Sequence, residues 1–228
     1  MKKKVLLIIL LLFVCFGCKK EEGEETGMKQ DLTIIEQASN GEITKGTLEG
    51  YTFVETDTPT DRIKIQMTDG RVMLAVLSNQ DSPITIANFK KLVSEHFYDG
   101  IIFHRVIKDF MIQAGDPSTA GKTGTYETIK GEFSKNGVTN RLSHTRGVLS
   151  MGRRGGNPDT AETMDSASTH FFIVHKDYPS LDGNYASFGK LFAGYDVLDS
   201  IAETSTDAYD KPYNEQKILS IRFINIEK

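Results

Sequence analysis

The chain has 228 residues, of which 39% are hydrophobic and 25% charged, and its formal net charge is -4. This composition is typical of a soluble globular protein, and the length fits one domain with appendages. Because nucleic-acid binding needs clustered cations that neutralise phosphates, we expect no nucleic-acid partner. The two cysteines, Cys15 and Cys18, lie near the start, so the rest of the chain has no disulfide, no thiolate metal ligand and no cysteine nucleophile.

The N-terminal segment has the organisation of an export signal. Lys2 to Lys4 precede an apolar run over residues 5–16, which is shorter than the ~20 residues of a spanning helix. The run ends with Gly17 before Cys18, and this resembles a bacterial lipoprotein processing site, in which the cysteine is lipidated. We therefore predict a signal peptide over residues 1–17 and a lipid-anchored protein of the cell envelope. The alternatives are an uncleaved anchor and an ordinary secretory signal.

Residues 18–61 are interpreted as the lipidated N-terminus and a linker. Residues 19–25 are polar and carry four glutamates, which is typical of a solvated tether. The same run is similar to acidic sorting tags of surface lipoproteins, so both a periplasmic and a surface-facing position on the outer membrane stay open. Residues 31–61 give ambiguous signals apart from a turn at Asn40-Gly41. Whether this segment packs on the following domain is also open.

From residue 62 onward, the sequence predicts regular secondary structure. Ile63, Ile65 and Met67 alternate with polar residues, which is the period of a half-buried strand. Asp69-Gly70 favours a two-residue hairpin turn, and a second strand follows over residues 72–77. A strand hairpin therefore opens the domain at residues 62–228.

Helices and further strands follow this hairpin. Thr85 is predicted to cap a helix with one apolar face, made by Ile86, Phe89, Leu92 and Val93. A second short helix is expected around residues 197–201. Apolar segments punctuated by glycine, together with an alternating segment near the C-terminus, predict short strands at 101–107, 110–114, 147–151, 171–174, 187–191 and 218–226. Many short strands with two helices indicate a mainly β barrel or sandwich rather than βαβ units.

The densest cluster of polar and aromatic residues runs from Phe103 to Asp116. It reads Phe-His-Arg, then Phe-Met-x-Gln, then Gly-Asp, and it resembles the signature of the cyclophilin family. Further matching segments follow in order at 88–89, 147–151, 171–173, 181–183 and 188–190. The resemblance covers residues 62–228 and implies a closed eight-stranded antiparallel β-barrel capped by two α-helices. It also implies a peptidyl-prolyl cis/trans isomerase that needs neither cofactor nor metal.

The chemistry of prolyl isomerisation needs a cation and an apolar pocket. Rotation about the peptide bond has a barrier of ~20 kcal/mol, because the nitrogen lone pair is delocalised into the carbonyl. A permanently charged guanidinium beside the twisted bond stabilises the localised lone pair of the transition state. By match to the family, Arg105 takes this catalytic role. The family resemblance assigns substrate binding to Phe110, Met111, Gln113, Gly152, Arg153, His170, Phe172, Leu181 and Tyr185.

Within that set, the resemblance gives different tasks to different side chains. The apolar members form the cup for the proline ring, Gln113 binds the substrate backbone and steadies Arg105, and Gly152 and Arg153 meet the peptide through main-chain groups. Three positions depart from the family. His170 stands where the family has glutamine and Tyr185 where many members have histidine. Ser180 replaces an aromatic residue linked to tight cyclosporin binding, so we expect weak cyclosporin inhibition.

The main hypothesis is an isomerase that acts on X-Pro bonds of proteins outside the cytoplasm and assists their folding. Its partners would be proline-containing polypeptides and, through Cys18, a membrane. The rival hypothesis is a non-catalytic module or chaperone that holds proline-containing segments in the same groove. A metal site is not expected, because the histidines show no HExxH spacing. ATP binding is not expected either, because residues 115–123 have one residue too many for a phosphate-binding loop.

Overall fold

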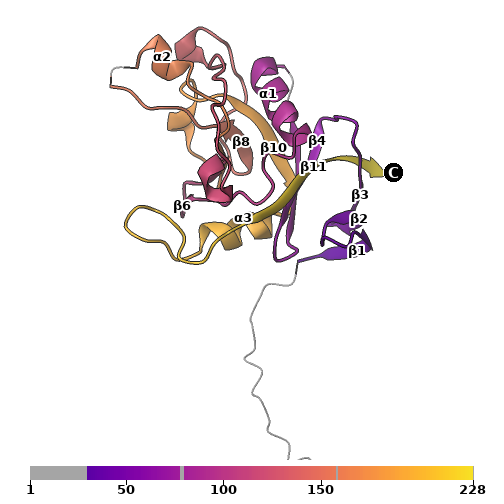
Figure 1. Cartoon of the computed structure of the whole chain (residues 1–228). Helices are drawn as coiled ribbons and strands as arrows, with labels where there is room; N and C mark the ends of the chain where they lie inside the picture. Colours follow the sequence, from indigo (N-terminus) through magenta and orange to yellow (C-terminus); the bar gives the residue numbers. More distant parts are fainter. Residues whose placement is uncertain (1–29, 78–79, 158, 228) are drawn as a thin grey trace, which may run out of the picture.

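The structure is a computed structural model that describes residues 30–77, 80–157 and 159–227 (Figure 1). The predicted signal peptide over residues 1–17 and the predicted lipidation site Cys18 lie outside the described residues. Over these described ranges, no helix has both the length and the apolar character needed to cross a membrane.

Eight antiparallel strands form the body of the domain. Their order in the sheet is β11, β4, β5, β10, β8, β9, β7 and β6. They span Ile218–Glu227 (β11), Arg62–Met67 (β4), Val72–Leu77 (β5), Ser187–Ala193 (β10), Val148–Met151 (β8), Phe171–Val174 (β9), Met111–Ala114 (β7) and Arg105–Ile107 (β6). The mainly β, antiparallel fold class predicted from the sequence is confirmed.

The two ends of this eight-stranded arrangement meet. Just before β6, Ile102 forms an antiparallel bridge with Lys217, directly before β11. The Phe103 amide donates to the Gln216 carbonyl at 2.8 Å, and the Ile218 amide donates to the Ile101 carbonyl at 2.9 Å. These bonds satisfy backbone groups that an open edge would leave unpaired.

Helices α1 (Pro83–Ser94) and α3 (Tyr195–Ala202) are the two that the sequence predicts, and they lie on opposite sides of the strands (Figure 1). A third, four-residue helix, α2 (Ala161–Met164), and three 3-10 turns, η1 (Pro117–Ala120), η2 (Ser134–Asn136) and η3 (Pro179–Leu181), lie in the connections. The α1 residues Phe89 and Leu92 are buried in the same core as Phe171 and Phe188. One hydrophobic core therefore joins the helices to the strands.

The start of α1 differs from the prediction. The helix begins at Pro83 with Ser82 as the N-cap, and Thr85 lies buried in the first turn instead of capping it. The carboxylate of Glu132 accepts hydrogen bonds from the amides of Ile84 and Thr85, at 3.0 and 2.7 Å. A distant acidic side chain thus satisfies the free amides and complements the helix dipole.

Residues 32–55, within the segment interpreted as a linker, form three strands. They are β1 (Leu32–Gln37), β2 (Ile43–Leu48) and β3 (Tyr51–Glu55). β3 pairs with the last four residues of β11, from Ile224 to Glu227, so this meander extends the sheet to eleven strands. The segment therefore packs on the domain that follows it, which the sequence left open.

The meander also changes the burial of β4. The alternation predicts that Lys64 and Gln66 face solvent, but they are 0% and 1% exposed. Gln66 accepts a hydrogen bond from the Ile43 amide, and the Lys64 ammonium donates to the Ile43 carbonyl and the Glu55 carboxylate. The prediction of a half-buried strand is wrong because β2 and β3 cover its second face.

Candidate functional site

Three predicted site residues lie in one row across neighbouring strands. Arg105 on β6 is directly opposite Gln113 on β7, and Gln113 is opposite Phe172 on β9. Directly opposed side chains of adjacent strands project from the same face of a sheet. Strand register therefore brings the guanidinium, the amide and the aromatic ring together, although they are far apart in the sequence.

Alternation along β7 separates the site from the core. Met111 belongs to a small apolar cluster with Phe172 and Leu181, whereas Ile112 and Ala114 are fully buried in the main core. On β9, Phe172 faces the same small cluster and its neighbour Phe171 faces the main core. The period of two thus gives each strand one structural face and one face available to a ligand.

These side chains enclose a cavity of about 120 Å³. Its lining consists of predicted site residues, namely Arg105, Phe110, Met111, Gln113, Gly152, Arg153, Phe172, Leu181 and Tyr185. A small cavity lined by apolar side chains together with a guanidinium and an amide can hold a small ring and polarise the adjacent backbone.

The turn between β6 and β7 presents Phe110. Asp109 has a φ of 62°, and its amide donates to Nδ1 of His175 at 2.9 Å. The Phe110 carbonyl accepts from the His175 amide at 2.9 Å, and the Phe110 ring packs on Tyr178 with centroids 4.5 Å apart. His175 therefore fixes the left-handed turn that places Phe110 at the cavity.

A buried histidine links the two walls of the cup. His144 is 2% exposed, its Nδ1 lies 2.7 Å from Asp182 Oδ1, and its Nε2 lies 2.9 Å from Ser150 Oγ. Burial lowers the pKa of His144, against the raising effect of the hydrogen bond to Asp182. The neutral ring stacks on Phe172, so His144 holds the segment that carries Leu181 against β9.

The Arg153 side chain has a structural partner. Its guanidinium forms two hydrogen bonds with Asp159, at 2.9 and 3.0 Å, and lies over the rings of Phe133 and Tyr185. Hydrogen bonds from Arg153 and Lys135 hold the pKa of Asp159 well below its usual range. The Arg153 guanidinium is therefore engaged by Asp159 and the two rings within the protein.

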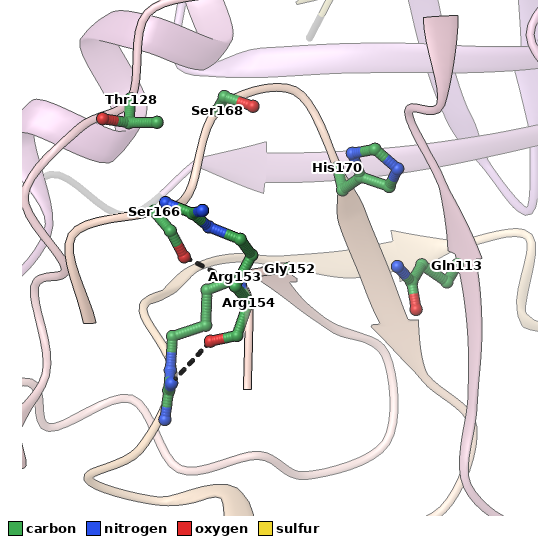
Figure 2. Close-up of a pocket in the computed structure, with 8 residues that line it drawn as sticks. All are labelled: Gln113, Thr128, Gly152, Arg153, Arg154, Ser166, Ser168 and His170. Atoms are coloured by element: carbon green, nitrogen blue, oxygen red, sulfur yellow. Dashed lines mark hydrogen bonds between the residues drawn. The ribbon is translucent and has the colours of Figure 1, made fainter. Parts of the chain in front are cut away.

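A second cavity of about 380 Å³ adjoins the first (Figure 2). It shares Gln113, Gly152 and Arg153 with the first and also has Thr128, Arg154, Ser166, Ser168 and His170 in its lining. Figure 2 shows His170 and Gln113 on one side and the two arginines on another. The structure thus places His170 beside the cup rather than in it, in a polar cavity that the sequence did not predict.

Two histidines next to this cavity favour their neutral forms. Burial lowers the pKa of His170, and burial together with the neighbouring His170 lowers the pKa of His104. Their rings meet edge to face with centroids 5.4 Å apart. Both imidazoles therefore stay uncharged near neutral pH, beside Arg105 and Gln113.

One neighbour of Arg105 was missed in the sequence. Asp210 Oδ2 lies 3.2 Å from Arg105 Nε, and both side chains are partly exposed. No hydrogen bond joins the side chains of Gln113 and Arg105 in the described part of the chain. Asp210 lies in the loop before β11, and no local sequence pattern links it to residue 105. The composition Asp-Lys-Pro at 210–212 indicates a turn but does not indicate a contact with Arg105.

Comparison with known proteins identifies the family of this arrangement. The family model for "Cyclophilin type peptidyl-prolyl cis-trans isomerase/CLD" matches residues 62–223. Peptidyl-prolyl cis-trans isomerase ppi1 of Schizosaccharomyces pombe is 36% identical over 69% of this chain and 95% of that protein. A peptidyl-prolyl cis-trans isomerase of Acinetobacter baylyi is 40% identical over 66% of this chain and 79% of that protein.

Solved structures agree with the family match. A crystal structure of a cyclophilin type isomerase from Cryptosporidium parvum aligns with a TM-score of 0.62 at 30% identity, over 74% of this chain and 98% of that one. The same protein in the presence of the dipeptide Ala-Pro aligns with a TM-score of 0.61 at 29% identity. The chain belongs to the cyclophilin-type peptidyl-prolyl cis-trans isomerase family.

Proposed function

We propose that this isomerase accelerates rotation about X-Pro bonds with Arg105 as its catalytic cation and the 120 Å³ cavity as its proline cup. The observation that carries the proposal is the shared lining, in which the guanidinium faces the same small space as Phe110, Met111 and Phe172. Apolar side chains hold the prolyl ring, and the cation lies beside the adjoining peptide bond. Proline-containing polypeptides are the substrates.

Catalysis follows from differential binding of the transition state. As the bond twists, the lone pair becomes localised on the prolyl nitrogen, and a guanidinium donor stabilises it more than it stabilises the planar amide. The cation never deprotonates near neutral pH, and its position in a partly apolar site strengthens the interaction. Gln113, opposite Arg105, is placed to bind the substrate backbone. No covalent bond is made or broken.

Hydrolysis is a weaker candidate, although Ser150, His144 and Asp182 are hydrogen-bonded in series. Ser150 is 0% exposed and its hydroxyl is engaged by Nε2 of His144 at 2.9 Å, so it is covered and not free to attack a bound peptide. A nucleophile must approach the reacting carbonyl to within hydrogen-bond-like distance. This series of hydrogen bonds supports the cup instead.

Exchange NMR on a short Ala-Pro peptide tests the proposal with wild type, Arg105→Ala and Arg105→Lys. We expect Arg105→Ala to lower the exchange rate by about a hundredfold while peptide affinity changes little, and Arg105→Lys to fall between the two. Equal background exchange in all three proteins, with peptide still bound, would instead support a proline-binding module. Thermal unfolding of each variant controls for the fold.

We also propose that the enzyme is a lipoprotein of the cell envelope, anchored through Cys18. The support is the sequence before the described domain, with three lysines, an apolar run and Gly17 before Cys18, followed by the polar residues 19–25. Its substrates are then proteins folding outside the cytoplasm. Cys18→Ser should move the protein from the membrane to the soluble fraction, and Cys15→Ser should not. Protease treatment of intact cells then separates surface from periplasmic exposure.

A further inference from the structure

The guanidinium of Arg105 has one acidic partner in the described part of the chain. Nε lies 3.2 Å from Asp210 Oδ2, and the side chains are 44% and 40% exposed. Nη1 and Nη2 have no hydrogen-bond partner among the described residues. An arginine has several donors in a fixed fork, so engagement at Nε leaves the outer two nitrogens available to a ligand.

The backbone of Asp210 is held independently of its carboxylate. Its carbonyl accepts from the Val106 amide at 2.8 Å, so the loop is attached to β6 next to Arg105. The Asp207 carboxylate accepts from the amides of Tyr209 and Lys211, at 2.8 and 3.0 Å. Asp210 itself has a φ of 64°, the left-handed conformation that glycine and asparagine also adopt. The turn therefore survives a change of the side chain at 210.

We propose that Asp210 is the positioning residue for Arg105. This inference rests on the proposed role of Arg105 as the catalytic cation. A half-exposed arginine without a partner samples many rotamers, and ordering it in the transition state costs conformational entropy. The carboxylate of Asp210 holds Nε before the substrate arrives, so that the arginine at the cavity is restrained in advance and Nη1 and Nη2 stay available to the substrate. Preorganisation of this kind accelerates the chemical step rather than substrate binding.

Gln113 does not supply this restraint in the described structure. It lies opposite Arg105, but no hydrogen bond joins the two side chains there. The restraint on Arg105 comes instead from Asp210, in the loop over residues 203–217, which lies outside the strands that form the cup. A restraint of this kind links the rate of isomerisation to the conformation of a surface loop.

The test uses the full chain with Asp210→Gly, Asp210→Asn and the control Glu203→Gln. Asp210→Gly removes the carboxylate without backbone strain, and Asp210→Asn keeps a neutral acceptor. Glu203 lies in the same loop and pairs with Lys108 at 3.1 Å, away from the cup lining. We expect kcat to fall about two- to fivefold in Asp210→Gly, with KM changed less than about twofold, and to fall less in Asp210→Asn. Glu203→Gln should match wild type.

A spectroscopic readout separates positioning from a general effect on the loop. The Nε–H proton of Arg105 should exchange with solvent faster in Asp210→Gly than in wild type, at an unchanged melting temperature. Wild-type kcat and wild-type Nε–H exchange in Asp210→Gly would overturn the inference. A wild-type rate in Arg105→Ala would overturn the proposed function itself, so the two failures are distinguishable. Should Asp210→Gly unfold, the same comparison in Asp210→Asn decides.

Discussion

The ammonium of Lys64 lies 2.5 Å from the Glu55 carboxylate, although the Lys64 side chain is fully buried. It also donates to the Ile43 carbonyl and to Gln66 Oε1. Burial lowers the pKa of Lys64, while the nearby Glu55 acts to raise it. This charge is therefore stabilised by its partners at the junction between the β1–β3 meander and the barrel.

Removing one partner of this pair should destabilise the fold strongly. Glu55→Ala leaves a buried ammonium without its counter-charge, and we expect the free energy of unfolding to fall by about 3 kcal/mol. Urea denaturation measures the change. The matched control is Glu227→Ala, which breaks the exposed ion pair between Glu227 and Lys45. This change should lower the free energy of unfolding by less than about 1 kcal/mol. Equal losses in the two variants would contradict the prediction.

Acidification below the ordinary histidine pKa should destabilise the domain. The pKa values of His104, His144 and His170 are lowered from 6.5, mainly by burial. The unfolded chain therefore binds more protons than the folded one, and the free energy of unfolding falls as the pH drops through 6.5. Urea denaturation at about pH 7.5 and about pH 5.5 measures this difference.

The variant His170→Gln tests the origin of that pH dependence. Glutamine does not titrate, so the loss of unfolding free energy between the two pH values should be smaller than in wild type. A wild-type domain that is equally stable at both pH values would show that the folded histidines accept protons without cost.

The two faces of the Phe110 to Ala114 segment should respond differently to truncation. Phe110→Ala removes an apolar wall of the cup, and we expect kcat/KM to fall about tenfold or more with little change in stability. Ile112→Ala opens the main core and should cost about 2–5 kcal/mol of unfolding free energy, with wild-type activity per folded molecule. Peptide exchange and urea denaturation on both variants check the contrast, and the reverse pattern would refute the assignment of faces.

Cyclosporin should inhibit this enzyme weakly. Ser180 lies exposed in the turn η3, next to Leu181 of the cup, at the position where the family resemblance implies an aromatic residue for tight cyclosporin binding. Ser180→Trp restores a large amphipathic ring at this position and should tighten inhibition at least about tenfold, whereas Ser180→Ala should not. Nanomolar inhibition of the wild type would disprove the expectation.

The sequence predicted those parts of the fold that local periodicity and turn composition specify. The β4–β5 hairpin, the apolar face of α1 and the closing strand β11 all lie where the alternation and the turn signals indicate. Most of the residues that the family resemblance singles out line one cavity, although they come from separate segments of the chain. The predicted elements rest on patterns within short segments, and the predicted site rests on the order of several such segments.

The remaining features depend on contacts between distant segments. Nothing around Lys64 indicates that residues 43–55 cover it, and its polar character predicts exposure. The cap of α1 comes from Glu132, and the partner of Arg105 comes from Asp210, each from a separate part of the chain. A single sequence carries no direct signal of such pairings, because they form only when the strands assemble.

The β1–β3 meander places the beginning of the described chain at the opposite end of the strand order from β6. The described chain begins at Gln30 beside β1, while β6 lies on the other side of the domain (Figure 1). The meander pairs with the last four residues of β11, whereas the segment before β6 bridges to Lys217 before β11 begins, so an anchor of the kind proposed above would join the domain at the opposite end of this strand from β6.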